Sequence, residues 1–203
     1  MAGGRFITFE GIDGSGKTTQ LRALAARLRE NGTAVVETRE PGGAEGAEAI
    51  RRLLVEGDPG RWSAETEILL FTAARRDHLE RRIAPALADG ATVLCDRFVD
   101  STRVYQGAAR AELRGTVDAL HALMIGIEPD LTLILDLDPG TAVARGAARG
   151  GVEDRFERFG PAFQARLRDG FLALAAEFPE RCRVVPADGP AETVAARVAE
   201  ALT

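Results

Sequence analysis

A glycine-rich segment of eight residues is the feature that most constrains how this chain can fold. Residues 11–18, Gly-Ile-Asp-Gly-Ser-Gly-Lys-Thr, fit the pattern G-x-x-x-x-G-K-[ST] at every fixed position. An apolar run precedes the segment, and Leu21, Leu24 and Leu28 follow it at helical spacing. Glycines let successive backbone N–H groups point inward, and the start of a helix carries positive partial charge. This order of strand, loop and helix therefore predicts a phosphate-binding loop.

Lys17, inside that loop, is the only lysine in the chain. At every other position where lysine or arginine could supply a positive charge, the chain has arginine. We therefore predict that an ammonium group is specifically required at position 17. Lysine at this point of a phosphate loop reaches the β- and γ-phosphates of a nucleotide, and the hydroxyl of Thr18 holds Mg²⁺. GTPases recognise guanine with an Asn-Lys-x-Asp element, which a chain without a second lysine cannot contain. ATP and Mg²⁺ are thus the expected cofactors.

Alternating short apolar runs and longer helical patterns predict a parallel sheet with helices on its faces. The expected class is α/β, a P-loop NTPase three-layer α/β/α fold with a five-stranded parallel sheet and a mobile lid. We expect one domain, residues 1–203, with the lid at about 145–158, where glycines and arginines are dense. The predicted strands are 5–10, 34–38, 92–96, 131–137 and 183–186, and the predicted helices include 64–88, bent at Pro85, 116–125, 161–177 and 190–202.

Composition excludes several classes of function. A formal net charge of −5 argues against a broad electrostatic grip on nucleic acid. Cys95 and Cys182 are too few for a disulfide framework and lack metal-ligand spacing, so we expect reduced core thiols. The chain begins without the long apolar stretch of a signal peptide or membrane span. We expect a cytoplasmic protein with small-molecule substrates and no nucleic-acid or membrane partner.

Outside the loop, the chain resembles bacterial thymidylate kinases over nearly its whole length. Four segments support the resemblance: Thr-Arg-Glu-Pro-Gly-Gly at 38–43, Leu-Leu-Phe-Thr-Ala-Ala-Arg-Arg-Asp-His at 69–78, Asp-Arg-Phe-Val-Asp-Ser-Thr-Arg-Val-Tyr-Gln-Gly at 96–107, and Asp-Arg-Phe-Glu at 154–157. The resemblance implies transfer of a phosphoryl group from ATP to dTMP, giving ADP and dTDP. It also implies a homodimer. Apolar patches within 64–87 and 116–125 are candidates for the contact, although on the residues alone they could equally be core.

The acceptor residues also have a physical interpretation. Asp96-Arg97 follows a predicted strand, at the edge where open parallel sheets bind ligands, and the Arg97 fork suits a second phosphate. Phe71 and Arg75 are spaced to share one helix face. From the residues alone, Phe71 could equally be core, Arg75 a solvated face, and Asp96-Arg97 a structural ion pair.

The resemblance assigns roles to individual residues. Phe71 stacks on thymine, Arg75 contacts the base, Arg97 holds the acceptor phosphate, Thr102 and Gln106 bond around the base, and Tyr105 crowds the sugar 2′ position. Asp13 lies near the 3′-hydroxyl and the metal. The predicted catalytic residues are Asp13, Lys17, Arg97, Arg149 and Arg155; the cofactor-binding residues are Gly11, Ile12, Asp13, Gly14, Ser15, Gly16, Lys17, Thr18, Thr19 and Arg145; Glu40, Pro41 and Ser101 join the acceptor set; Thr18 and Asp96 are the metal ligands.

The lid prediction has internal support. Thymidylate kinases carry a basic residue either after the loop aspartate or in the lid, and here Gly14 follows Asp13 while the lid is rich in arginine. Arg149 and Arg155 are then expected at the phosphates and Arg145 on adenine, although a solvated basic loop is the alternative. Arg103 departs from the small residue typical of the family, which puts base or sugar selectivity in doubt. His78 and His121 have no catalytic partner in sequence and are expected to be structural.

Rival functions remain open on the residues alone. A kinase for another monophosphate or for a deoxynucleoside would share the fold, and a nucleoside kinase would need a base to activate a sugar hydroxyl. A P-loop regulator would bind ATP and signal by loop ordering, without ADP release that depends on an acceptor.

Overall fold

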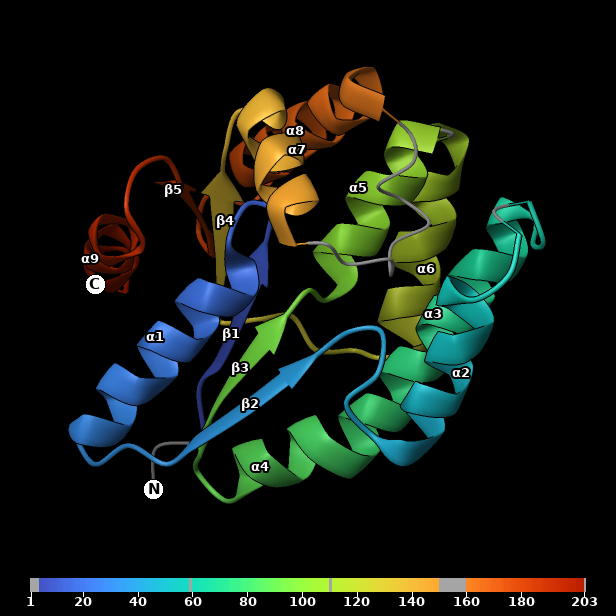
Figure 1. The fold of residues 1–203 in the computed structure, drawn as a ribbon. Helices are drawn as coiled ribbons and strands as arrows, with labels where there is room; N and C mark the ends of the chain where they lie inside the picture. Colours follow the sequence, from blue (N-terminus) through green and yellow to red (C-terminus); the bar gives the residue numbers. More distant parts are fainter. Residues whose placement is uncertain (1–3, 59, 110, 150–159, 203) are drawn as a thin grey trace.

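The computed structural model describes residues 4–58, 60–109, 111–149 and 160–202 (Figure 1). Its strands are β1 (Phe6–Glu10), β2 (Val35–Arg39), β3 (Thr92–Asp96), β4 (Leu131–Asp136) and β5 (Cys182–Pro186). Its helices are α1 (Lys17–Glu30), α2 (Glu45–Val55), α3 (Ala64–His78), η1 (Leu79–Ile83), α4 (Ala84–Ala88), α5 (Val99–Ala109), η2 (Ala111–Leu113), α6 (Arg114–Met124), α7 (Pro139–Arg149), α8 (Gly160–Glu177) and α9 (Ala191–Glu200). None of these helices is both long and apolar enough to cross a membrane.

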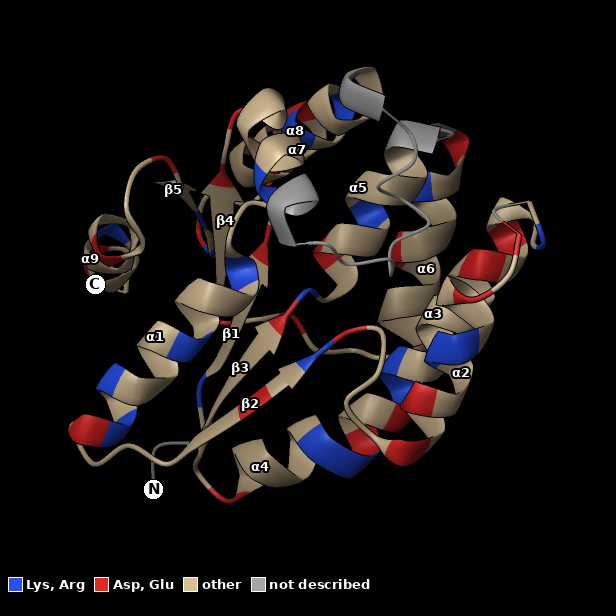
Figure 2. Cartoon of the chain, viewed as in Figure 1, with Lys and Arg blue, Asp and Glu red and all other residues tan. Residues whose placement is uncertain are grey.

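Within the described residues, five parallel strands form one sheet in the order β2-β3-β1-β4-β5. The register pairs Phe9 of β1 and Arg39 of β2 with Asp96 of β3, so three strands end at nearly the same level. This confirms the expected five-stranded parallel sheet. Charged residues of both signs gather where β2 and β3 end, at the carboxyl edge of the sheet (Figure 2).

The two faces of the sheet are covered by different helices. Side chains alternate along a strand, so Phe6 of β1 packs in one cluster with Ile68 of α3, whereas Ile7 packs in another with Leu21 of α1. Helices α1 and α9 lie side by side on the second face (Figure 1). The three-layer α/β/α arrangement follows from this alternation, because both faces are apolar and each must be buried.

The end of α1 follows the expected stop signal. Asn31 caps the helix, and Gly32 takes the left-handed conformation with φ +79°. The N–H of Thr33 then donates to the carbonyl of Leu28, 3.0 Å away, as is typical where a left-handed residue ends a helix.

Residues 64–88 are helical throughout, as predicted, but the irregularity lies before Pro85. Helix α3 continues into the π-helical turn η1, where the N–H of Ala84 donates to the carbonyl of Leu79. Proline has no N–H and its ring would clash with the carbonyl four residues earlier. A wider turn directly ahead of Pro85 accommodates the proline by a local change of helix type.

The α-helices α2, α5 and α7 were not predicted from the sequence. The predicted basic loop was expected to begin at about residue 145, but residues 145–149 form the end of α7. The rest of the predicted lid, residues 150–158, lies outside the described residues. Glycine and arginine density favoured a loop, but tertiary contact overrides such weak local preferences. The backbone of α7 packs directly against the phosphate loop.

Candidate active site

The phosphate loop joins β1 to α1 by a close-packed turn. Gly11, Gly14 and Gly16 have φ of +132°, +84° and +96°, which favours glycine. A Cβ atom on Gly14 would lie 2.2 Å from the carbonyl oxygen of Ala142 in α7. Gly14 is therefore required both by backbone conformation and by space.

Lys17 begins α1 and folds back over the loop. Its side chain is 7% exposed, and Nζ donates to the carbonyls of Gly11, 3.1 Å away, and Ile12, 2.9 Å away. Burial, together with the positive charge of Arg97, lowers the pKa of Lys17 to about 8. The hydroxyl of Ser15 is buried without a hydrogen-bond partner in the described part of the chain. The loop thus presents an ammonium and an unsatisfied hydroxyl, groups that suit an anion.

Thr18 and Asp96 connect the first turn of α1 to the end of β3. Thr18 Oγ1 donates to Asp96 Oδ2 over 2.5 Å. A hydroxyl and a carboxylate are the hard oxygen ligands that Mg²⁺ prefers, and Mg²⁺ in nucleotide sites keeps several waters. Among the described residues no cluster of three or more histidine, cysteine or acidic side chains could hold a metal by itself. The donor set fits a magnesium ion bound jointly with phosphates.

Arg97 occupies the turn between β3 and α5. Its guanidinium donates to Asp13, to Ser101 Oγ at 2.8 Å, to Tyr105 Oη at 3.2 Å and to the Gly11 carbonyl at 3.2 Å. Asp13 also accepts from Tyr105 Oη, 3.1 Å away. Burial opposes ionisation of Asp13, but the charges of Arg97 and Lys17 outweigh it and hold its pKa below the usual value. The phosphate loop and helix α5 therefore both contact the guanidinium of Arg97.

Arg75 projects from α3 into a buried polar cluster. Its Nε donates to Glu40 Oε2, 2.7 Å away, and Nη2 donates to Thr102 Oγ1, 2.9 Å away. The side chains of Arg75 and Glu40 are 3% and 4% exposed. Phe71 lies one helical turn before Arg75 and is partly buried. The predicted i, i+4 spacing of these two residues on one helix is confirmed.

His78 completes that cluster from the last position of α3. Its Nδ1 lies 3.1 Å from Glu40 Oε1, and Nε2 lies 2.6 Å from Thr38 Oγ1. The histidine is fully buried and links the end of β2 to α3. It fixes Glu40, which in turn fixes Arg75.

The loop after β2, which contains Pro41, is held by α2. Glu48 Oε1 accepts from the N–H of Gly43 over 2.9 Å, and Arg51 Nη1 donates to the Pro41 carbonyl over 2.8 Å. Neither Glu48 nor Arg51 was predicted from sequence, because no helix was expected over residues 45–55. An amphipathic pattern over 45–55 was the available signal.

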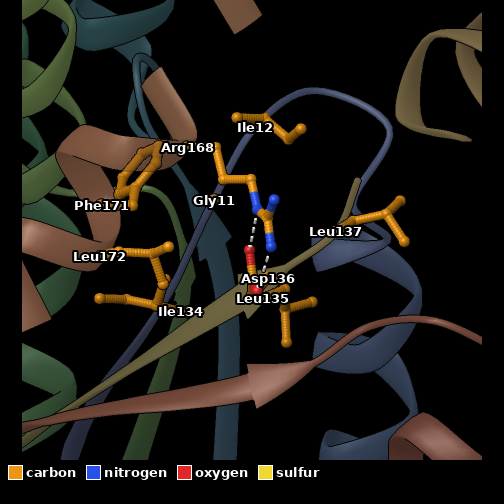
Figure 3. A pocket seen from close by; sticks show the side chains of 9 residues that line it. All are labelled: Gly11, Ile12, Ile134, Leu135, Asp136, Leu137, Arg168, Phe171 and Leu172. Carbon is orange, nitrogen blue, oxygen red and sulfur yellow. Dashed lines mark hydrogen bonds and ion pairs between the residues drawn. The ribbon is translucent and has the colours of Figure 1, made fainter. Parts of the chain in front are cut away.

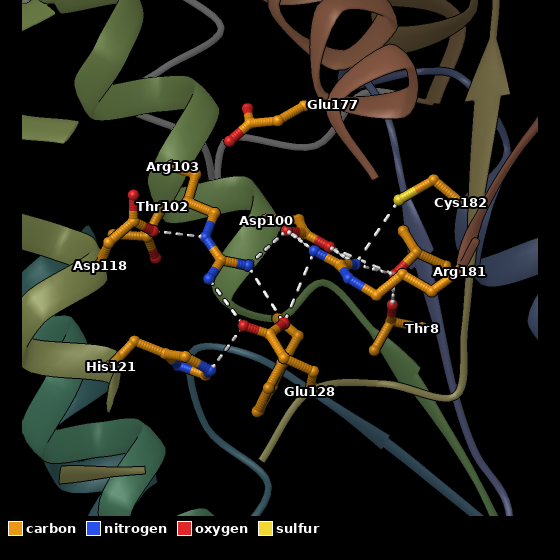
Figure 4. Close-up of polar contacts among 12 residues, drawn as sticks. Thr8, Asp100, Thr102, Arg103, Asp118, His121, Glu128, Glu177, Arg181 and Cys182 are labelled. Carbon is orange, nitrogen blue, oxygen red and sulfur yellow. Dashed lines mark hydrogen bonds and ion pairs between the residues drawn. The ribbon is translucent and has the colours of Figure 1, made fainter. Parts of the chain in front are cut away.

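Arg103 of α5 lies in a cluster of carboxylates. It is 5% exposed, and its guanidinium donates to Asp100 and Asp118 and forms two bonds with Glu128, one of 2.7 Å (Figure 4). Asp100 is also held by Arg181, the residue before β5, over 2.6 Å. Carboxylates on α5, α6 and the following segment therefore hold the Arg103 side chain, and an effect of this residue on base or sugar selectivity stays a prediction to be tested. His121 lies 3.2 Å from Glu128 Oε1 at the margin of this cluster.

The remaining predicted residues are placed as follows. Arg145 of α7 donates to the carbonyls of Ala187, 3.2 Å away, and Gly189, 3.4 Å away. Gln106 is buried in α5, and Thr19 is exposed in the first turn of α1. Arg149 is the last residue of α7, and Arg155 lies outside the described residues.

A narrow crevice behind the phosphate loop is distinct from this group of charges. It lies between β4 and α8, and Arg168 bridges it by donating to Asp136 over 2.5 and 2.9 Å (Figure 3). The ion pair and the apolar side chains of Ile134 and Phe171 fill the space. We therefore assign the crevice to packing.

The parallel sheet, the phosphate loop and the arginine turn that contacts it define the class of P-loop nucleotide kinases. The thymidylate kinase family model matches residues 9–198. The chain belongs to the thymidylate kinase family. It is 64% identical to a thymidylate kinase of Ruegeria pomeroyi over 97% of this chain and 93% of that one, and 64% identical to one of Dinoroseobacter shibae over 98% and 97%. The crystal structure of thymidylate kinase from Ehrlichia chaffeensis matches with a TM-score of 0.80 and 37% identity, covering both chains completely.

Proposed function

We propose that this chain transfers the γ-phosphoryl group of ATP to dTMP, giving ADP and dTDP. Family membership supports the reaction, and the position of Arg97 is the observation that supports this site for it. One guanidinium contacts the phosphate loop through Asp13 and the acceptor helix through Ser101. A cation between two phosphate sites is what a transfer between two anions requires.

The donor half of the proposed site is the loop of residues 11–18. Backbone N–H groups and the start of α1 would surround the phosphates of ATP, and Lys17 would exchange its two loop carbonyls for phosphate oxygens. Thr18 and Asp96 would hold Mg²⁺, directly or through water. Held there, Mg²⁺ would supply positive charge that offsets the negative charge of the phosphates. Arg145, beside the carbonyls of Ala187 and Gly189, is our candidate for the adenine end.

The acceptor half would hold dTMP between α3 and α5. Arg75 is oriented by Glu40 and Thr102, so its fork is fixed before a base arrives. Phe71, one turn away, is the candidate ring for stacking, and Tyr105 is the candidate for excluding a 2′-hydroxyl. Glu40, Pro41, Thr102 and Gln106 complete the proposed acceptor set.

The proposed mechanism needs no strong base. A phosphate monoester is largely dianionic near neutral pH because its second pKa is about 6. The difficulty is repulsion between the nucleophile and ATP, which Arg97 and Lys17 would reduce by charge and by alignment. Arg149 and Arg155 stay predictions for the transferring phosphoryl group, with residues 145–158 predicted to exclude water.

A homodimer in the cytoplasm is the proposed working form. Leu69 of α3 is 57% exposed, and Leu123 and Met124 of α6 are 79% and 41% exposed. Arg76 of α3 donates to the carbonyl of Met124 over 2.8 Å, so these side chains belong to neighbouring helices. Apolar side chains this exposed on adjacent helices favour contact with a second copy. The double substitution Leu69→Glu and Leu123→Glu should yield monomers by light scattering.

The proposed activity is tested by ADP release with dTMP, dUMP, UMP, dCMP, GMP and thymidine offered in turn. We expect turnover to be fastest with dTMP. Faster turnover of thymidine would indicate a nucleoside kinase, and ATP binding without acceptor-dependent ADP release would indicate a P-loop regulator.

A further inference from the structure

Glu10 is a buried carboxylate that the proposed reaction leaves without a role. It is the last residue of β1, directly before the phosphate loop, and it is 0% exposed. Burial of an ionisable group is unfavourable unless hydrogen bonds replace the lost water. The groups that supply those bonds therefore indicate what the carboxylate does.

Both oxygens of Glu10 accept hydrogen bonds from the start of α5. Oε1 accepts from the backbone N–H of Phe98 over 2.7 Å, and Oε2 accepts from Ser101 Oγ over 2.6 Å. Phe98 immediately precedes α5, and Ser101 lies in its first turn. Backbone N–H groups at this end of a helix lack partners within it and carry positive partial charge. Glu10 thus acts as a helix cap supplied by a strand.

Ser101 extends the contact from Glu10 to Arg97. The hydroxyl has one proton, which it donates to Glu10, so its oxygen is left to accept from Arg97 Nη1 at 2.8 Å. The backbone N–H of Arg97 donates to the carbonyl of Phe9, 2.9 Å away, and Nη1 also contacts the carbonyl of Gly11. The residues before, at and after Glu10 therefore all contact Arg97 or its hydroxyl partner.

The backbone of Arg97 needs such support. Its φ is +70°, and it is the one non-glycine residue with positive φ in the described part of the chain. L-residues with side chains rarely adopt this conformation, and it persists where the surroundings determine it. The bond from Phe98 N–H to Glu10 holds the peptide that follows Arg97.

We infer that Glu10 is a positioning residue that orients the turn and guanidinium of Arg97 toward the acceptor phosphate. The inference rests on the proposed function, which assigns Arg97 to dTMP. Glu10 itself is covered by the residues it contacts and would touch neither substrate. We therefore expect substitution of Glu10 to change the KM for dTMP and to leave the KM for ATP nearly unchanged.

The first test is Glu10→Gln, with Glu30→Gln at the exposed end of α1 as the matched control. The amide keeps the shape, but its NH₂ group cannot accept the bond that one carboxylate oxygen accepts. We expect the KM for dTMP to rise about tenfold, the loss typical of a bond to a charged group, with the KM for ATP within about twofold of wild type. Equal rises in both KM values, or no change in a folded variant, would overturn the inference.

A double-mutant cycle tests the route through Ser101. Ser101→Ala should raise the KM for dTMP in the same direction, and adding Glu10→Gln should cost little more, because both remove one chain of contacts. If the two increases in the KM for dTMP instead multiply in the double variant, Glu10 acts independently of Ser101 and Arg97. Should Glu10→Gln fail to fold, Glu10→Asp takes its place, because it keeps the carboxylate but shortens its reach to Ser101. The KM for dTMP should still rise, and an unchanged KM for dTMP would refute the inference.

The wild-type chain separates this inference from the proposed function. If wild type does not use dTMP, the proposed function fails. If wild type uses dTMP and Glu10→Gln behaves like wild type, only the role of Glu10 fails.

Discussion

The guanidinium of Arg97 donates a hydrogen bond to the carboxylate of Asp13 across 84 positions of sequence. Asp13 belongs to the phosphate loop and Arg97 to the turn that begins the acceptor helix. Each residue stabilises the charged form of the other. Their hydrogen bond connects the phosphate loop to helix α5 in the structure without substrate.

Arg97→Ala should abolish most activity with dTMP. The variant removes a cation from the proposed acceptor-phosphate site and leaves Asp13 with one fewer partner. We expect kcat/KM for dTMP to fall by about two orders of magnitude or more, as charge-assisted bonds to a phosphate imply. Arg29→Ala, which breaks an exposed pair with Glu37, is the matched control and should keep wild-type kinetics. Retention of more than a third of wild-type kcat/KM by Arg97→Ala would exclude the proposed acceptor role.

Lys17 should be an unusually reactive amine. Its pKa of about 8 leaves more neutral amine near neutral pH than an ordinary lysine has. Because it is the only lysine, an amine-selective reagent should modify one side chain, and mass spectrometry can follow that site by itself. We expect the modification rate to rise with an apparent pKa near 8 and ATP with Mg²⁺ to protect. A rate insensitive to nucleotide would contradict the donor assignment.

Glu40→Gln should destabilise the fold as well as weaken dTMP binding. Arg75 and Glu40 are nearly fully buried, and the substitution leaves the guanidinium without its counter-ion. Breaking a buried pair on one side typically costs about 3–5 kcal/mol of unfolding free energy. Urea denaturation measures this, with the exposed Glu30→Gln expected within about 0.5 kcal/mol of wild type. Wild-type stability of Glu40→Gln would show that the pair is not formed in solution.

Arg103→Ala should affect stability without altering base selectivity. The substitution leaves Asp100 and Glu128 short of a partner, so unfolding free energy should fall by about 3 kcal/mol. The ratio of kcat/KM for dTMP to that for dUMP should stay within about twofold of wild type, because the guanidinium of Arg103 is occupied by Asp100, Asp118 and Glu128. A changed ratio would restore Arg103 as a selectivity residue.

Glu10 should make stability depend on pH. Burial, and then the nearby charge of Asp100, raise its pKa to about 7 from 4.5, while Arg97, Ser101 and Phe98 oppose the rise. The native state therefore binds this proton more tightly than the unfolded chain does. Its contribution is present below pH 4.5 and is lost as pH rises through 7, a change of about 3 kcal/mol. The difference in unfolding free energy between wild type and Glu10→Gln should follow that course, and a flat difference would contradict it.

Prediction from sequence succeeded where the signal is local. The phosphate loop, the end of α1 at Asn31 and Gly32, and the five strands were all predicted from spacing within short segments. It failed at α7, where arginine and glycine density suggested a loop, and it could not identify the carboxylate partners of Arg103, because they lie on separate elements. It also passed over Glu10, although a carboxylate at the end of an otherwise apolar buried strand was a usable signal.

The sequence alone determined the class of fold, the phosphate loop and the family, because periodicity and motif spacing are properties of neighbouring residues. Only the tertiary structure decided which polar and charged side chains pair with one another. Thr18 meets Asp96, Arg75 meets Glu40, and Arg97 meets Asp13 over separations of 78, 35 and 84 residues. Such pairs arise because parallel strands bring their carboxyl ends to one edge, where burial makes each charge depend on the partner that the fold supplies.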